Sequence, residues 1–486
     1  MEKSERLQVL IALFLLGIAC FSAMNVLELR AEEPRRAVVA MEMLWRGKWL
    51  TPTIHELPYY NKPPFFNWVL ATFFYLFGSM EEWVVRLPSL LAFLATGAGL
   101  YGFSRRYLSL QTAILAAFFF LTFSNLLFYG SVNTGEMDLM LTFFIFVQML
   151  CLFHFHQKRQ WVLMFVLSYL FTALNFLMKG IPAIVFQGFT LIGLLILSGE
   201  WKQLFNWKHG LGILTFLGLV GTYFLAYQTQ QNGLGYLTNL FQESKQKSMV
   251  ESNGSAIAWH LLSFLPNTLS LLLPWSLIPL LLLRKANRIN WLDNAWLRFT
   301  LIFVACNIWI YWLSPNTFNR YLYPFFPFFA LWFAAAALQT SFSFRFWMNT
   351  VIILLAARII FNFTVLVYQQ NNSNQLVYRD LSKELVHTAQ QERIFFTGVP
   401  VVSLPAIALF GTTFYQDTLF TPPTLPYQLP YYIGKAQQQP LTYHQEPVKG
   451  LFYLTYEDFA LRQSTEIYYT FQEKWTNRQM VLVKFK

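Results

Sequence analysis

Apolar runs of about twenty residues recur along this chain, and they limit the folds that it can adopt. A helix needs about 20 mostly apolar residues to cross a bilayer. Only 12% of the 486 residues are charged, whereas a soluble domain has about 25%. We therefore expect an all-α polytopic membrane protein with about 11–13 transmembrane helices. The eleven clearest runs lie near residues 7–27, 83–103, 111–128, 138–156, 161–178, 181–198, 211–228, 259–283, 297–313, 321–339 and 347–368.

The positive charges follow the pattern of membrane orientation. The formal net charge is +11, but Lys and Arg gather in short loops between the apolar runs. Pairs such as Arg105–Arg106, Lys158–Arg159 and Arg284–Lys285 lie in the cytoplasm if the N-terminus does. The first loop, residues 28–82, and the tail then lie outside. This distribution does not indicate a nucleic-acid partner, and we expect none.

The composition changes abruptly after residue 368. "QQNNSNQ" is typical of a linker, and "LVYRDLSKELVHTAQQE" has helical periodicity. "RIFFTG", "GLFYLTY" and "MVLVKFK" are typical of short strands. We expect a transmembrane domain over residues 1–368 and a small extracytoplasmic α/β domain over residues 369–486.

The first outer loop begins with an acidic pair and a basic pair, in "EEPRRAVVAMEML". Pro34 favours the first turn of a helix, and the helix dipole favours Glu32 and Glu33 at its N-terminus. Arg35 and Arg36 follow at one-turn spacing, so local ion pairs with Glu32 are an ordinary explanation. The apolar positions that follow suit a helix at the membrane interface.

The same loop holds one lysine in a rigid aromatic frame, "PYYNKPPFFNW". The residue before a proline is excluded from helical geometry, and Pro63–Pro64 favours the start of a helix at "FFNWVLATFFYLFG". Lys62 could be an interfacial lysine whose ammonium reaches to water. The frame favours anion binding, and the aromatic faces of Tyr59 and Tyr60 suit a sugar ring.

Charged residues of both signs recur near the outer ends of later runs. Glu136 and Asp138 open the fourth run, Lys179 ends the fifth and Arg320 precedes the tenth. Buried ionisable groups in a membrane are costly unless they are paired or functional. We expect a polar cavity that opens outward, in which carboxylates and cations face each other.

The sequence gives no support for a metal or a cofactor. On a helix, Glu136 and Asp138 would point about 200° apart, which is poor geometry for sharing an ion. His55 and His260 have no partner at ligand spacing, and the three cysteines lie far apart inside apolar runs. We expect neither a metal nor a cofactor.

This set of residues suits sugar transfer from a lipid phosphate. A carboxylate takes the proton of the acceptor hydroxyl, and cations stabilise the departing phosphate. A glycoside hydrolase would usually need a pair of carboxylates.

The acidic pair followed by Arg, then "YYNKPP", then "RLPSLL", resembles the bacterial lipid A aminoarabinose transferase family. That family is related to the protein O-mannosyltransferases within the GT-C class of membrane glycosyltransferases. The resemblance is strongest over residues 25–110. It continues weakly through "VNTGEMDLMLTFF", "LMKG" and "RYLYPFFP".

The resemblance implies a role for each matching residue. Glu32 matches the catalytic base, Glu33 its acidic neighbour and Arg35 an active-site arginine. Tyr59 and Lys62 match residues that hold the phosphate of the donor.

The resemblance also implies substrates and a location. Asp138 matches a second acidic position, and the donor is an undecaprenyl-phosphate sugar used on the periplasmic side of the bacterial inner membrane. The acceptor hydroxyl belongs to an envelope lipid, glycan or protein. The sequence departs from the family at two positions: Glu32 stands where the family has Asp, and Asn61 stands where it usually has Glu.

Two other classes of function remain open from the sequence. A transporter or lipid-sugar flippase could use the same charges as a substrate path, although transporters usually place them near the bilayer midplane within repeats. A non-catalytic assembly subunit would bind a partner through its tail.

Overall fold

The computed structural model describes residues 2–128, 132–246, 254–282, 293–315, 318–371, 377–398, 403–404, 408–409, 412–413, 419–420, 425–473 and 477–486. The chain forms two compact units. The first unit comprises Met1–Met24, Arg86–Leu225 and Leu240–Val365, and the second comprises Asn25–Val85, Ala226–Asn239 and Leu366–Lys486. The last boundary lies close to the predicted division at 368/369. The predicted outer loop, however, shares a unit with the tail.

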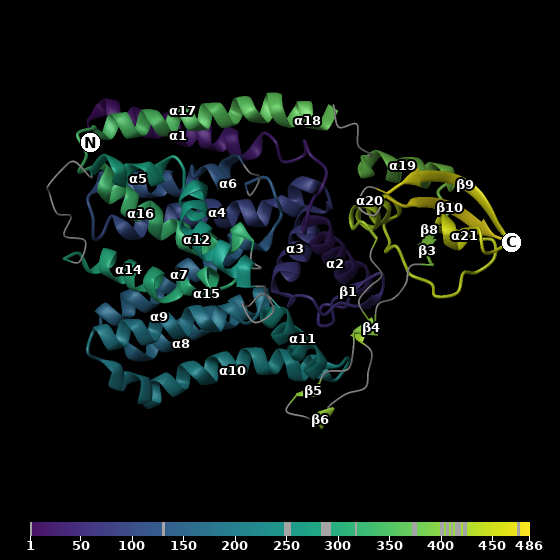
Figure 1. The fold of residues 1–486 in the computed structure, drawn as a ribbon, viewed down its shortest axis with the longest axis horizontal. Helices are drawn as coiled ribbons and strands as arrows, with labels where there is room; N and C mark the ends of the chain where they lie inside the picture. The colour runs from purple at the N-terminus through teal and green to yellow at the C-terminus, as the bar shows by residue number, and fades with distance from the viewer. Residues whose placement is uncertain are drawn as a thin grey trace. The chain divides into compact units, whose positions relative to one another are not determined.

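The first unit is helical, and each of the eleven apolar runs overlaps one of its helices (Figure 1). Wholly or in part it contains α1 (Lys3–Phe21), α4 (Glu82–Ser104), α5 (Leu110–Leu121), α6 (Ser124–Phe128), α7 (Met137–Gln157), α8 (Trp161–Lys179), α9 (Pro182–Leu197), η1 (Trp201–Phe205), α10 (Trp207–Gln228), α11 (Gly233–Gln246), α12 (Gly254–Leu271), η3 (Trp275–Leu277), α13 (Ile278–Leu282), α14 (Ala295–Asn307), α15 (Trp309–Trp312), η4 (Asn319–Phe325), α16 (Phe326–Ala337) and α17 (Phe344–Phe361).

Among the described residues, seven helices are long and apolar enough to cross a membrane. They are Lys3–Phe21, Glu82–Ser104, Met137–Gln157, Trp161–Lys179, Trp207–Gln228, Ala295–Trp312 and Phe344–Gln370. The bent pair Ile257–Leu271 and Trp275–Leu282 makes up to eight, and α3, α5 and α9 are shorter apolar helices. The polytopic helical class is confirmed, whereas the count of 11–13 spans stays a prediction.

Polar side chains link neighbouring helices inside the first unit. Gln148 on α7 donates hydrogen bonds to Thr172 on α8 (3.1 Å) and Gln187 on α9 (2.8 Å). It accepts one from Asn175 on α8 (2.9 Å). Such bonds between membrane helices contribute about 0.6 kcal/mol each on average. They help to fix the relative positions of α7, α8 and α9, and the start of α7 and the end of α8 carry charged residues described below.

The second unit is mixed α/β. It contains α2 (Glu33–Arg46), β1 (Thr53–Ile54), β2 (Leu57–Pro58), α3 (Phe65–Phe77), α18 (Val367–Asn371), α19 (Tyr378–Thr388), β3 (Ile394–Phe396), β4 (Ser403–Leu404), β5 (Ala408–Leu409), β6 (Thr412–Thr413), β7 (Leu419–Phe420), α20 (Gln428–Gln437), β8 (Phe452–Tyr456), α21 (Glu457–Ala460), β9 (Thr465–Gln472) and β10 (Gln479–Phe485). η5 (Asn362–Leu366) lies at the boundary between the units.

The tail folds around a four-stranded sheet of order β3-β8-β10-β9. β3 and β8 are parallel, and the other two pairs are antiparallel. β8 is buried along its whole length, and β10 is largely buried. The predicted helix and three strands are found as α19, β3, β8 and β10. The sequence prediction missed α20 and β9, and most residues of β9 are exposed, so that the strand lacks a continuous apolar signal.

Candidate active site

The N-terminus of α2 has the predicted geometry. Glu32 is the N-cap residue, and Pro34 lies in the first turn. Glu33 is fully buried, and its Oε2 accepts a hydrogen bond from the backbone N–H of Arg30 (2.9 Å). Between them, Ala31 has a left-handed φ of 52°. A non-glycine residue rarely adopts this conformation, and such strain is concentrated at functional sites.

Glu32 binds both arginines of the basic pair. Arg35 forms an ion pair with its Oε2 at i,i+3 spacing, and Nη2 of Arg36 lies 3.5 Å from the same oxygen. The side chain of Glu32 is 31% exposed, whereas that of Arg36 is 2% exposed. The local ion pairs expected from the spacing are therefore present. Glu32 is the more accessible carboxylate of the acidic pair.

Arg36 connects the acidic pair to the aromatic loop. Its Nη1 donates a hydrogen bond to the hydroxyl of Tyr59 (2.6 Å), and its guanidinium lies 5.8 Å from the centroid of the Tyr59 ring. Tyr59 in turn is held by a backbone bond to Pro52 (2.9 Å). The structure thus brings Glu32, Arg36 and Tyr59 together within the second unit.

The loop that carries Lys62 is held by aromatic contacts. The ring of Tyr60 packs edge-on against Tyr236 (5.7 Å) and Tyr227 (6.5 Å). The hydroxyl of Tyr236 donates a hydrogen bond to the carbonyl of Lys62, and Asn239 donates one to the carbonyl of Tyr60 (2.9 Å). Lys62 itself is buried, at 9% exposure. This burial disfavours the alternative of a lysine that reaches to water.

A buried carboxylate later on α2 fixes the hairpin before this loop. The two-residue turn between β1 and β2, His55–Glu56, has positive φ at both positions, 58° and 68°. Glu42 accepts hydrogen bonds from the Thr53 hydroxyl (2.6 Å) and from the backbone N–H groups of His55 (2.6 Å) and Glu56 (3.2 Å). Burial raises the pKa of Glu42 to about 7, although these donors act in the opposite direction.

The first unit brings the four later charged residues together. Lys179, the last residue of α8, forms an ion pair with Asp138 in the first turn of α7. Nη1 of Arg320 on η4 lies 2.8 Å from both carboxylate oxygens of Glu136, and its Nε lies 3.4 Å from Asp138. The expectation that carboxylates and cations face each other is confirmed for this group.

The geometry of Glu136 corrects one prediction. The expectation of carboxylates about 200° apart assumed that Glu136 and Asp138 both lie within a helix. Glu136 is instead the N-cap residue of α7, with extended φ and ψ of −88° and 146°. Both carboxylates therefore contact one guanidinium. Burial lowers the pKa of Arg320, but the charges of Asp138 and Glu136 outweigh it, and the net effect raises this pKa.

Two further contacts to the candidate site were not predicted. The guanidinium of Arg35 lies 5.6 Å from the ring centroid of Tyr427, in the tail. Burial raises the pKa of Tyr427, while Arg35 lowers it by a smaller amount. Lys179 lies 3.9 Å from the ring centroid of Tyr321. The contact between Arg36 and Glu32 could be found from the sequence, because the two residues are four positions apart. No sequence pattern indicated the contact between Arg35 and Tyr427.

The ten predicted site residues fall into two groups. Glu32, Glu33, Arg35, Tyr59, Tyr60 and Lys62 lie in the second unit, and Glu136, Asp138, Lys179 and Arg320 lie in the first. That all ten serve one pocket stays a prediction. Across the described ranges, no group of three or more His, Cys, Asp or Glu side chains is arranged to hold a metal ion.

Comparison with known proteins gives sequence relatives over part of the chain. A family model described as dolichyl-phosphate-mannose-protein mannosyltransferase matches residues 61–225. The undecaprenyl phosphate-alpha-4-amino-4-deoxy-L-arabinose arabinosyl transferase of Erwinia tasmaniensis is 24% identical over 310 residues, which cover 62% of this chain and 54% of that protein. The protein of the same name from Edwardsiella ictaluri is 28% identical over 251 residues, 50% of this chain and 44% of that protein. The chain spans about half the length of these curated relatives.

Comparison with solved structures covers nearly the whole chain. The crystal structure of ArnT from Cupriavidus metallidurans bound to undecaprenyl phosphate matches with a TM-score of 0.71 and 15% identity, over 98% of this chain and 97% of that chain. The apo structure of the same protein gives a TM-score of 0.69. The chain therefore has the GT-C-like fold of ArnT, and its sequence resembles the aminoarabinose transferases, as the motifs around Glu32 and Lys62 predicted.

Proposed function

We propose that this protein is a membrane glycosyltransferase that moves a sugar from a polyprenyl-phosphate donor to an acceptor hydroxyl. The observation that carries the proposal is the arrangement around Glu32. A partly exposed carboxylate is held by two arginines, and one of these arginines contacts the tyrosine of the loop that contains Lys62. This group of residues contains one accessible carboxylate that can act as a base and several cations. These are the groups that the reaction needs.

The proposed reaction forms a bond between the acceptor oxygen and the anomeric carbon of the sugar. The bond from that carbon to the lipid phosphate breaks, and the phosphate leaves with the electron pair. Glu32 takes the proton of the acceptor hydroxyl as general base. The leaving phosphate is a weak base, so it needs cations and no acid, and preorganised charges are the main source of its stabilisation.

The arginines have a double role in this proposal. Without substrate, Arg35 and Arg36 both form ion pairs with Glu32. A donor phosphate competes for the same guanidiniums, because Arg binds phosphate and carboxylate with the same planar fork. When Arg35 turns to the phosphate, Glu32 becomes free to accept a proton. Buried Glu33 supports the turn at Ala31 and the start of α2.

The four charged residues of the first unit bind substrate in the same proposal. Lys179 and Arg320 supply cations for a phosphate or an anionic acceptor, and Asp138 and Glu136 hold them in place. The relatives' names support an undecaprenyl-phosphate-linked sugar as donor. The acceptor is an envelope lipid, glycan or protein.

The location is proposed from charge. The basic loops Arg105–Arg106 and Lys158–Arg159 lie in the cytoplasm under the positive-inside rule. The N-terminus of α2 and the start of α7 then face the periplasm of a bacterial inner membrane.

The test uses the full-length protein in proteoliposomes with undecaprenyl phosphate-α-4-amino-4-deoxy-L-arabinose as the first donor and lipid A as acceptor. Glu32→Gln should lower the turnover number by at least about 100-fold. Undecaprenyl phosphate should raise the unfolding temperature of this variant at least as much as that of the wild type, because Arg35 and Arg36 no longer pair with a carboxylate at position 32. Glu384→Gln, at an exposed residue of α19, is the matched control and should keep full activity.

If 4-amino-4-deoxy-L-arabinose is not the sugar that is transferred, binding of undecaprenyl phosphate alone still tests the proposed class of donor. Lys62→Met and Arg35→Gln should then weaken its binding, and the Glu384 variant should not. Wild-type turnover in Glu32→Gln would refute the assignment of the base. A transporter would leave the donor chemically intact on both sides of the membrane.

A further inference from the structure

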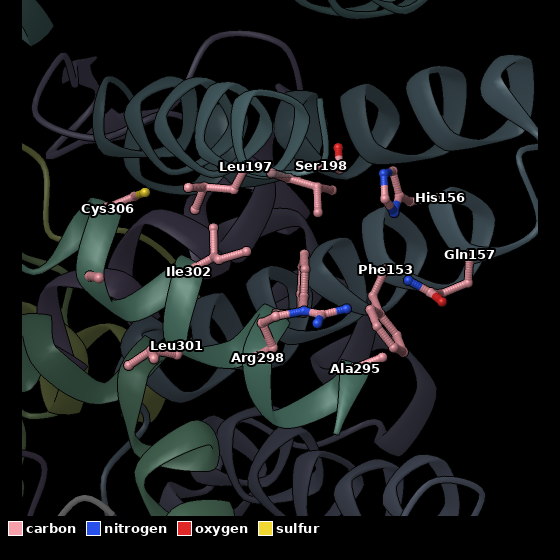
Figure 2. A pocket seen from close by; sticks show the side chains of 13 residues that line it. Phe153, His156, Gln157, Leu197, Ser198, Ala295, Arg298, Leu301, Ile302 and Cys306 are labelled. Carbon is pink, nitrogen blue, oxygen red and sulfur yellow. The ribbon is translucent and has the colours of Figure 1, made fainter. Parts of the chain in front are cut away.

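A cavity of about 550 Å³ lies between α7, α9 and α14 in the first unit (Figure 2). Its walls are mainly apolar and include Leu194, Leu197, Phe299 and Leu301. This volume is within the range of small-ligand pockets, about 300–1,000 Å³. The cavity is not used in the reaction proposed above.

The sequence explains why space remains between these helices. At Gly193, α9 and α14 approach so closely that a Cβ atom would lie 2.5 Å from Sγ of Cys306. Towards the end of α9 and the start of α14, the wall positions include the small residues Ser198 and Ala295. The two helices therefore enclose a wedge that is closed at Gly193 and open at the end of the bundle.

The cavity lies at the opposite end of the helices from the charged group. Asp138 is in the first turn of α7, and His156 and Gln157, which line the cavity, are at its last turn. Eighteen residues of helix span about 27 Å, close to the roughly 30 Å thickness of the hydrocarbon core. In the orientation proposed above, the start of α7 faces the periplasm. The open end of the wedge is then at the level of the headgroups of the cytoplasmic leaflet.

Charge at this end favours an anion. Arg298 lines the cavity, and in Figure 2 its guanidinium extends towards Phe153 and Gln157. Glu200 is nearby, but His156 (2.7 Å) and Arg159 (3.8 Å) bind its carboxylate. An arginine over an apolar wedge at headgroup depth matches a lipid that has an acyl chain and a negative phosphate.

We propose that this wedge binds an anionic phospholipid, with one acyl chain between α9 and α14 and the headgroup phosphate on Arg298 and the amide of Gln157. A prenyl-phosphate donor fits less well, because its phosphate would lie about 27 Å along α7 from Asp138. A partner helix, about 10 Å wide, does not fit a wedge that closes to van der Waals contact at Gly193.

The experiment measures binding by native mass spectrometry and by the thermal shift of the full-length protein in detergent. The probes are phosphatidylglycerol and phosphatidylcholine with identical acyl chains. The wild type should retain phosphatidylglycerol in preference to phosphatidylcholine. Arg298→Gln should weaken the phosphatidylglycerol affinity by about fivefold, the contribution of one cation at a lipid surface. Ala305→Trp should fill the wedge and prevent binding of both lipids.

Arg105→Gln is the matched control, because Arg105 is an exposed arginine just after α4 and does not line the wedge. It should bind phosphatidylglycerol as the wild type does. Equal binding of the two lipids, or unchanged binding in Arg298→Gln, would overturn the proposal. Displacement of phosphatidylglycerol by undecaprenyl phosphate would also overturn it, by assigning the wedge to the donor. Arg298 is exposed, so its Gln variant should fold even if Ala305→Trp does not. The readout is binding, so the result is independent of the proposed transferase activity.

Discussion

Replacing Asp138 by Asn should destabilise the first unit more than replacing Lys179 by Met. The side chains of both residues are only 7% exposed. Loss of Asp138 leaves the Lys179 ammonium buried, with the Tyr321 ring as its remaining electrostatic partner among the described residues. Loss of Lys179 leaves Asp138 with a second cation, Arg320, at 3.4 Å. The two variants should differ because Asp138 keeps an opposite charge nearby when Lys179 is replaced, whereas Lys179 keeps none within the described ranges when Asp138 is replaced.

The magnitude follows from the cost of a buried unpaired charge. Removing one partner of a buried ion pair costs about 3–5 kcal/mol. The ring of Tyr321 at 3.9 Å offsets about 1–2 kcal/mol of that loss by a cation–π contact. We expect about 3 kcal/mol for Asp138→Asn and about 1–2 kcal/mol for Lys179→Met. The double variant should be less destabilised than the two losses added together, by about 1–3 kcal/mol.

The assay is the apparent free energy of unfolding in mixed micelles, followed by far-ultraviolet circular dichroism for the wild type, both single variants and the double variant. Lys383→Met, at an exposed residue of α19 that pairs with Asp380, is the matched surface control and should cost less than about 1 kcal/mol. A coupling energy below about 0.5 kcal/mol, or a larger loss in Lys179→Met than in Asp138→Asn, would refute the reasoning.

Three further predictions concern other positions. Burial raises the pKa of Glu42 from 4.5 to about 7. The contribution of Glu42 to the free energy of unfolding should therefore be complete below about pH 4.5 and should be lost as the pH rises through 7. The expected fall is about 3 kcal/mol. Unfolding of the wild type and of Glu42→Gln at pH 5 and pH 8 checks this, and the variant should lack the fall. Gly193→Ala should cost about 1–3 kcal/mol through its clash with Cys306, whereas Gly188→Ala on the same helix has open space and should be neutral or stabilising in thermal unfolding. Trp275→Ala should cost about 3–5 kcal/mol, because the fully buried ring stacks on an aromatic neighbour at 3.9 Å, and Trp275→Phe in the same assay should recover most of this loss.

Local signals predicted the elements that position the candidate site. Pro34 and the acidic pair located the start of α2, and Pro63–Pro64 located the start of α3. Both helices begin at residues whose backbone preferences are local, so no tertiary information was needed. The apolar runs predicted the membrane helices for the same reason, since a span is defined by its own length and hydropathy.

What the sequence did not reveal depends on contacts between distant segments. Glu136 was assigned a helical direction, although a single extended residue before α7 turns its carboxylate towards Arg320. The strand β9 is mostly exposed, so its apolar alternation is too weak to detect. Tyr427 reaches Arg35 across almost 400 positions of the chain, and no pattern near either residue indicates the contact.

The tail is a structural part of the candidate site. Two adjacent arginines point in different directions from one helix, yet both bind Glu32, because positions i+3 and i+4 lie on either side of it. Arg36 then reaches Tyr59 in the first loop, and Arg35 reaches Tyr427 in the tail.

A second tail residue fixes the chain just before this helix. The hydroxyl of Tyr432 donates a hydrogen bond to Glu82 (3.1 Å) and accepts one from the backbone N–H of Leu29 (3.0 Å). Removal of the tail would therefore expose the chain that leads into α2. It would also remove the contact of Arg35, one of the two arginines that hold Glu32, with Tyr427. A protein that used its tail only to bind a partner would not need these contacts, so their presence within one compact unit supports the transferase proposal over the assembly-subunit alternative.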